Sequence, residues 1–295
     1  MTTQTDHVKG LAVTGLGGML LTFDIPLLRL GDGESWSVIF LRSVCSIVVM
    51  LAVWLALKRF GRNPPPLIQG RTGWIVAALY ALTGLCFLLA VFLTPTANLV
   101  FILALNPMIA ALLGRIFLGE RLRRETLVAM IAMAAGVFII VSGGIAAGSL
   151  IGNLLALGAA GSLAAALTVS RASGKDMGFS AVMSGGFLIL ISGIVVLFNG
   201  YRIEAPVWIV LDGAILLPIS MFCLATGTRW LTGPEVAMFY MLETVLAPIW
   251  VWWIFSEVPE RHTFIGGAIV LGTLVIHTGV QIARDRKRRL AARPV

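Results

Sequence analysis

The stretch that decides the fold is TANLVFILALNPMIAALLGRIFLGE, residues 96–120, an apolar run with Asn106 and Pro107 at its middle and a glutamate at its end. An altered copy follows later in the chain, GPEVAMFYMLETVLAPIWVWWIFSE, residues 233–257. The shift from residue 96 to residue 233 places Asn106 on Glu243 and Glu120 on Glu257. The chain therefore carries two copies of one apolar helix, and we expect each copy to be interrupted halfway.

Composition places these helices in a membrane. Of the 295 residues 58% are hydrophobic and only 12% are charged, and the mean hydropathy is +0.96. A soluble domain carries roughly a quarter charged residues. A membrane span needs about 20 mostly apolar residues, so continuous apolar runs of this length predict an all-α polytopic membrane protein. They differ from the alternating segments of about ten residues that make up a transmembrane barrel.

Turn residues divide the chain into ten expected spans. Pro64, Pro65 and Pro66 fall in one loop, and Asn199 and Gly200 fall in another. The spans are expected at residues 8–25, 35–57, 72–93, 96–118, 126–141, 150–170, 179–198, 206–228, 233–255 and 262–282.

The basic residues indicate how the spans are oriented. The net charge of +8 could indicate nucleic acid, but most basic residues fall in loops on one side if the N-terminus is cytoplasmic. This bias predicts a multi-pass membrane protein with both termini on the cytoplasmic side. We interpret the basic tail, residues 284–295, as a topology and lipid-headgroup signal and not as a nucleic-acid site. The first apolar run opens late, contains Asp24 and lacks a small-residue cleavage pattern, so we expect it to be retained.

A repeat of five spans connects the two halves of the chain. The shift of the quoted stretches also carries Thr83 onto Ser220 and Cys86 onto Cys223. Because five is odd, the two copies must have opposite orientations, and we expect repeats at residues 1–143 and 144–283. Inverted repeats place a substrate site near the membrane midplane, where rocking exposes it to either side in turn.

The segments LNPMIAALLGRIFLGERL and LETVLAPIWVWWIFSEVP carry a family resemblance. With ten spans in two inverted halves, the chain resembles the EamA-type branch of the drug/metabolite transporter superfamily over essentially its whole length. Within that branch, LETVLAPIW resembles the aromatic amino-acid exporters of the YddG type. The resemblance implies outward transport of small metabolites, amino acids among them, across a bacterial-type inner membrane. The transport cavity that it implies is lined by spans one, three, four, six, eight and nine.

Glu243 is the strongest candidate for a substrate-binding residue. A carboxylate near the middle of a span costs about 2.5–3.5 kcal/mol on insertion scales, and such residues are usually functional. Asn106 is its counterpart in the first copy. The alternative is that Glu243 is protonated or hydrogen-bonded and ties helices together. Further candidate pocket residues at helical spacing are Asn98, Phe101, Tyr80, Met238, Phe239 and Trp250, although aromatic and methionine stripes are more often packing surfaces.

Proline and glycine have separate predicted roles. Pro107 and Pro248 are candidates for kinks that shape or gate the pocket. Small residues allow close approach of membrane helices, and the candidates for this role are Gly15, Gly17, Gly18, Gly158 and Gly161. Arg42 is predicted to snorkel or to pair with an acid, and Asp24 is predicted to be interfacial.

Three function classes remain open from the sequence. A secondary transporter working by alternating access, for amino acids or as a broad-specificity drug/metabolite exporter, fits best. A membrane-embedded lipid-modifying enzyme needs converging acids or histidines, and His7, His262 and His277 are scattered. A channel is the third class, but short loops and inverted halves favour alternating access over a channel.

No cofactor is expected, because the three cysteines lack metal or disulfide spacing and there is no nucleotide-binding loop. Facilitated transport and proton-linked exchange both stay open, as does the oligomeric state.

Overall fold

The computed structural model describes residues 4–61, 66–119, 124–146, 148–175, 177–227, 230 and 233–291. Over these residues the chain is helical apart from its turns and one isolated bridge between Gly33 and Ile203. The elements are α1 (Gln4–Leu21), α2 (Asp24–Leu30), α3 (Ser35–Arg59), α4 (Gly70–Leu93), α5 (Thr96–Leu103), α6 (Asn106–Leu118), α7 (Arg124–Ala146), α8 (Leu150–Ser173), α9 (Gly178–Val182), α10 (Ser184–Asn199), α11 (Pro206–Val210), the π-helical segment η1 (Leu211–Leu216), α12 (Leu217–Gly227), α13 (Gly233–Phe255) and α14 (Arg261–Ala291).

These elements confirm the predicted all-helical membrane fold. Nine helical stretches within the described residues are long and apolar enough to cross a membrane, and Met241–Phe255 adds a shorter apolar helix. Span boundaries agree closely with the prediction; the ninth, Gly233–Phe255, matches it at both ends. Large side chains such as Phe138, Phe198 and Trp253 are exposed on the surface, as expected where a helix faces lipid rather than water.

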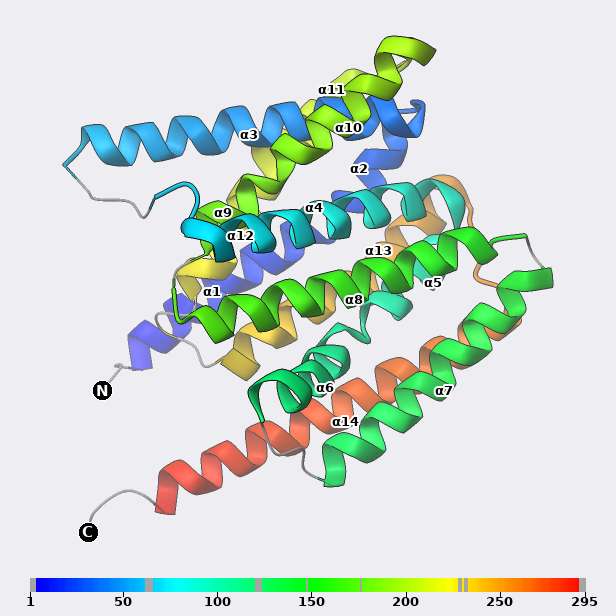
Figure 1. Cartoon of the computed structure of the whole chain (residues 1–295). Helices are drawn as coiled ribbons and strands as arrows, with labels where there is room; N and C mark the ends of the chain where they lie inside the picture. The colour runs from blue at the N-terminus through cyan, green and yellow to red at the C-terminus, as the bar shows by residue number, and fades with distance from the viewer. Residues whose placement is uncertain are drawn as a thin grey trace.

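The helices pack in pairs that connect the two halves of the chain. Five of these pairs are α1 with α12, α3 with α10, α4 with α8, α5 with α13, and α7 with α14, and α6 with α8 and α1 with α13 also pack closely. Figure 1 shows α3 beside α10 at one edge and α7 beside α14 at the other, with the remaining helices between them. If the ten expected spans are numbered from the N-terminus, the first five pairs join spans 1 and 8, 2 and 7, 3 and 6, 4 and 9, and 5 and 10. This set of pairs is unchanged when each span is exchanged with the one five places away.

Both termini lie at the same end of the molecule (Figure 1). We call this end the terminal end and the opposite one the distal end. The terminal end contains the last turn of α3, and the distal end contains the loop from α2 to α3 and the loop from α13 to α14. The contacts that close the distal end are described below.

The interruption predicted at the middle of residues 96–120 is present in the first copy. Helix α5 ends at Leu103, and α6 starts at Asn106 after a turn at Ala104 and Leu105. Pro107 lies in the first turn of α6, where the backbone N–H that it lacks would have no helical partner. Glu120, at the end of this copy, lies outside the described residues.

The interruption expected in the second copy is absent. Helix α13 runs through Pro248 as one helix, from Gly233 to Phe255. Pro248 lies in the helix interior, where it removes the hydrogen bond to the carbonyl of Thr244 and the helix continues on both sides. The prediction of two equivalent broken helices is therefore wrong for α13. Breaks occur instead at Thr22–Phe23 between α1 and α2, and at Met183 between α9 and α10.

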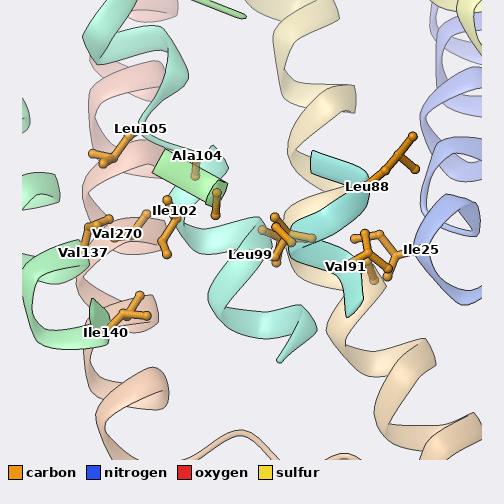
Figure 2. Close-up of a cluster of buried hydrophobic side chains, with 14 of the residues drawn as sticks. Ile25, Leu88, Val91, Leu99, Ile102, Ala104, Leu105, Val137, Ile140 and Val270 are labelled. Carbon is orange, nitrogen blue, oxygen red and sulfur yellow. The ribbon is translucent and has the colours of Figure 1, made fainter. Parts of the chain in front are cut away.

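The apolar core lies on both sides of the broken span. Figure 2 shows Ile102 of α5 among Val137, Ile140 and Val270, and Leu99 on the opposite side near Leu88. All six side chains are less than 5% exposed. This packing holds α5 between α4 on one side and α7 with α14 on the other, and so fixes the place where the span breaks.

Candidate functional site

A buried cluster of charged side chains connects helices far apart in sequence. Arg42 of α3 donates from Nε to Asp212 Oδ2 over 2.7 Å and from Nη2 to Asp24 Oδ1 over 2.5 Å. The exposed fraction is 9% for Arg42, 4% for Asp24 and 0% for Asp212. We call these three residues the ion cluster. Burying one cation with two anions is costly unless each charge is closely paired, so the geometry must be maintained.

Local backbone structure places Asp212 in this cluster. Asp212 lies in η1, and Pro218 just beyond it cannot donate a hydrogen bond to the preceding turn. Single π-helical turns often mark functional sites. Gly213 brings η1 against α3, because a Cβ there would lie 2.8 Å from the backbone oxygen of Arg42. Ser46 donates its hydroxyl to the Gly213 carbonyl over 3.1 Å and so ties the two helices together.

The ion cluster decides between the two alternatives for Arg42, corrects the expectation for Asp24 and adds a residue. Of the two alternatives for Arg42, the structure shows pairing with acids, and the side chain does not snorkel. Asp24 was predicted to be interfacial, but it is buried because it is paired with Arg42. Sequence reasoning missed Asp212. The signal available in the sequence was Asp212 itself, an acid inside an otherwise apolar span, because the predicted intramembrane Arg42 needed a counter-ion.

Glu243 is the candidate carboxyl that has no partner. It makes no hydrogen bond or ion pair with any residue that the structure describes, and it is half-buried near the middle of α13. It interacts electrostatically with Asp24 and Arg42. An unpaired carboxyl beside a buried ion cluster is available to bind a ligand or a proton.

Two aromatic residues predicted to lie beside Glu243 pack against α1 and the turn that follows it. Trp250 donates from Nε1 to Thr22 Oγ1 over 3.0 Å and stacks on Phe23 with ring centroids 5.0 Å apart. Phe239 covers Gly15 and Gly18, whose added Cβ atoms would lie 3.3 Å from its ring and 2.7 Å from its carbonyl oxygen. The side chain of Met238 lies outside what the structure describes.

The candidates on the fourth span divide between two environments. Asn106, at the start of α6, is half-buried and donates from Nδ2 to the Ala160 carbonyl of α8 over 3.1 Å. Asn98 is buried in a network with Asn153 and Thr263 at 3.3 and 2.6 Å. Phe101 packs toward α14, because a Cβ on Gly267 would lie 2.2 Å from its ring. Of these three residues, only Asn106 has a polar side chain that is also accessible.

Tyr80 of α4 is half-buried, and no described partner engages its hydroxyl. It lies about one turn before Thr83, which shares a hydrogen bond with Ser162 of α8 over 2.9 Å. Gly161 precedes Ser162, and an added Cβ there would meet nothing within 4 Å. Tyr80 and Gly161 thus lie on the two helices of one pair, α4 and α8.

The glycines predicted to allow close helix packing do so in most cases. Gly17 is pressed against α12, with Cys223 Cβ 2.8 Å from an added Cβ. Gly158 meets Cys86 Sγ at 3.3 Å in the corresponding pair of α4 and α8. Cys86 and Cys223 were aligned by the repeat, and both act as small packing residues. Gly161 departs from the prediction, since no neighbouring atom approaches it.

Polar contacts close the distal end. The carboxylate of Glu257 forms an ion pair with Arg29 of α2 and accepts from the Thr96 backbone N–H over 2.8 Å. Arg29 Nη2 also donates to the carbonyls of Val91 and Thr94 at 3.2 and 3.3 Å. Glu257 therefore caps the first turn of α5 and holds it to α2 and α4. The two halves of the broken span share one partner: α5 packs against both α13 and α8, and α6 packs against α8.

The comparisons with known proteins give the family context for this site. Residues 12–142 match the EamA-like transporter family. This match indicates a transporter. The chain is 24% identical over 249 residues to the pseudopaline exporter CntI of Pseudomonas aeruginosa, covering 79% of this chain and 82% of that protein. One solved crystal structure shares the fold, with a TM-score of 0.63 at 16% identity over 93% of this chain and 98% of its own.

These findings support the resemblance to the EamA superfamily and favour a transporter over an enzyme, so the lipid-modifying alternative is not retained. They do not confirm a particular closeness to aromatic amino-acid exporters. The family match covers most of the first predicted repeat, and the relative at 24% identity extends the similarity into the second.

Proposed function

We propose that this protein exports neutral amino acids, aromatic ones among them, or similar small metabolites across the inner membrane by alternating access. The observation that carries this proposal is Glu243, a carboxyl in the interior of α13 with no described partner and with accessible surface. A carboxylate there can pair with the ammonium group of an amino acid. Asn106 of α6 and Tyr80 of α4 are further polar side chains that are half-buried.

The architecture supports alternating access between two inverted repeats, residues 1–143 and 144–283. Each principal helix pair joins one repeat to the other, and the set of pairs is unchanged when the repeats are exchanged. Two structurally equivalent halves around a shared site can rock in either direction with similar contacts, which is the basis of transport by inverted repeats.

The conformation fits a carrier closed toward the outside. The Arg29–Glu257 pair and the stacking of Trp250 on Phe23 hold the distal end together. With cytoplasmic termini, as the basic loops predict, this distal end faces outward. Opening toward the outside then requires these contacts to separate, while corresponding contacts form at the terminal end.

A broad-specificity exporter of drugs and metabolites with the same fold is the second candidate. The methionine and aromatic residues around Glu243 favour it, because flexible and polarisable side chains adapt to varied apolar ligands. The two candidates differ in whether the amino acid backbone or the apolar side chain dominates recognition.

Transport by the purified chain in liposomes tests the proposal. We expect time-dependent and saturable uptake of labelled phenylalanine, competed by aromatic and aliphatic amino acids and weakly by charged ones. Competition by unrelated apolar cations at equal concentration would favour the broad-specificity exporter. Absence of saturable flux for every amino acid in the panel would reject amino-acid export.

A further inference from the structure

We propose that the ion cluster of Asp24, Arg42 and Asp212 binds the proton that drives export, which makes the protein a proton/substrate antiporter. This inference rests on the proposed function and adds its coupling ion. One proton is taken from the water on one side and released to the water on the other for each substrate that moves outward. The argument starts from the charges that the chain has buried.

The charges in the cluster do not balance without a proton. Two carboxylates face one guanidinium, so one negative charge is left over when both acids are ionised. Uncompensated charge in an interior of low dielectric is strongly unfavourable. A single proton bound to one of the two acids makes the cluster neutral.

The geometry provides a place for that proton. Asp24 and Asp212 contact the same guanidinium, Asp24 at Nη2 and Asp212 at Nε, so a proton bound to either acid leaves the other paired with Arg42. Asp212 Oδ1 is buried and has no hydrogen-bond partner among the residues that the structure describes, so it can carry the proton while Oδ2 accepts from Arg42.

The charged environment of the cluster is otherwise sparse. Glu243 of α13 is a further acid, and its charge interacts with those of Asp24 and Arg42. Arg29 on α2 is neutralised by Glu257 at the distal end. The other described ionisable groups on the helices packed around the cluster are Cys45, Tyr80, Cys86 and Cys223, the basic residues Lys9, Lys58, Arg59, Arg71 and Arg171 toward the terminal end, and Arg261, His262 and His277 on α14.

This arrangement links the proton to the substrate by electrostatics. When the cluster loses its proton, Asp24, Asp212 and Glu243 together carry two negative charges more than Arg42 balances. A substrate ammonium group at Glu243 offsets part of this excess, so proton release and substrate binding favour each other. Arg42 and Asp212 belong to different halves of the chain, and a change in their pairing therefore acts on the contact between the halves.

Infrared spectroscopy of the full-length protein without substrate tests the proton site directly. We expect a protonated-carboxyl stretch at neutral pH that is lost in Asp212→Asn and in Asp24→Asn, because either variant leaves one acid balanced by Arg42. Each variant thus keeps a paired arginine and is expected to fold. Glu243→Gln is the matched control, and the band removed by Asp212→Asn must persist in it. A spectrum without any band that Asp212→Asn removes would overturn the inference.

Transport against a gradient tests the coupling. With liposomes acidic inside, we expect labelled phenylalanine to accumulate about tenfold per pH unit, because one proton crossing one unit supplies about 1.4 kcal/mol. Asp212→Asn is expected to bring the internal concentration no higher than the external one. Accumulation by Asp212→Asn equal to wild type would overturn the coupling and leave export intact. Absence of any phenylalanine flux would count against the proposed function, and the infrared result alone would then decide the proton site.

Discussion

Arg42 joins Asp212 across 170 residues of sequence, with Nε donating to Oδ2 at 2.7 Å inside the protein. Asp24 pairs with the same guanidinium from the first position of α2. This contact fixes α2, α3 and η1 relative to one another. Because one cation serves two acids, the stability of this region depends on Arg42 more than on either acid alone.

Replacing Arg42 by Gln is expected to lower the free energy of unfolding by about 3–5 kcal/mol, the usual loss when a buried ion pair is broken from one side. Thermal unfolding of the detergent-solubilised protein measures the effect. Arg59→Gln is the control, since Arg59 is exposed at the end of α3. Equal midpoints for the two variants would show that the buried cluster contributes little stability.

Glu243→Gln is expected to reduce transport at least tenfold while the protein remains folded in the membrane. The substitution keeps the size of the side chain and removes the negative charge that pairs with the substrate. Initial rates in liposomes, normalised to folded protein, measure the change. Glu260→Gln, in the exposed loop between α13 and α14, is the control and should transport as wild type. Wild-type flux in Glu243→Gln would assign Glu243 a structural role.

Gly17→Ala and Gly161→Ala should have opposite outcomes. At Gly17 the new methyl group would lie 2.8 Å from Cys223 Cβ and 2.9 Å from the Ser220 carbonyl oxygen, so α1 and α12 must separate. Overpacking of this kind costs about 1–3 kcal/mol. At Gly161 the methyl group meets nothing within 4 Å, and we expect no loss. Thermal midpoints of the two variants decide the matter, and a larger loss at Gly161 would contradict the packing described here.

Glu257→Gln should loosen the distal end. It removes the ion pair with Arg29 and weakens the cap on the Thr96 N–H. The pair is partly exposed, with side-chain exposures of 19% and 25%, so we expect only about 0.2–1 kcal/mol of coupling in a double-mutant cycle with Arg29→Gln. Faster amide hydrogen exchange in the first turn of α5 is the more sensitive measurement. Unchanged exchange at residues 96–99 would show that Glu257 does not hold this turn.

The sequence determined the class of fold and most of the element boundaries. Membrane helices form their backbone hydrogen bonds internally, so each apolar run folds as a helix whatever its neighbours are. This is why the end of the span at Phe255 and the break around Asn106 were both predictable. The repeat also aligned Cys86 with Cys223, and both occupy equivalent packing positions.

The tertiary structure alone decided which polar residues meet. Asp24, Arg42 and Asp212 lie on three separate elements, and no spacing in the sequence shows that they share one buried position. The two copies of the quoted stretch also differ in a way that their alignment does not reveal: the first is broken before Pro107, whereas α13 continues through Pro248. Local patterns determine helices because their hydrogen bonds are local. The ion cluster depends on how those helices pack, since its energy comes from charges brought together across the chain.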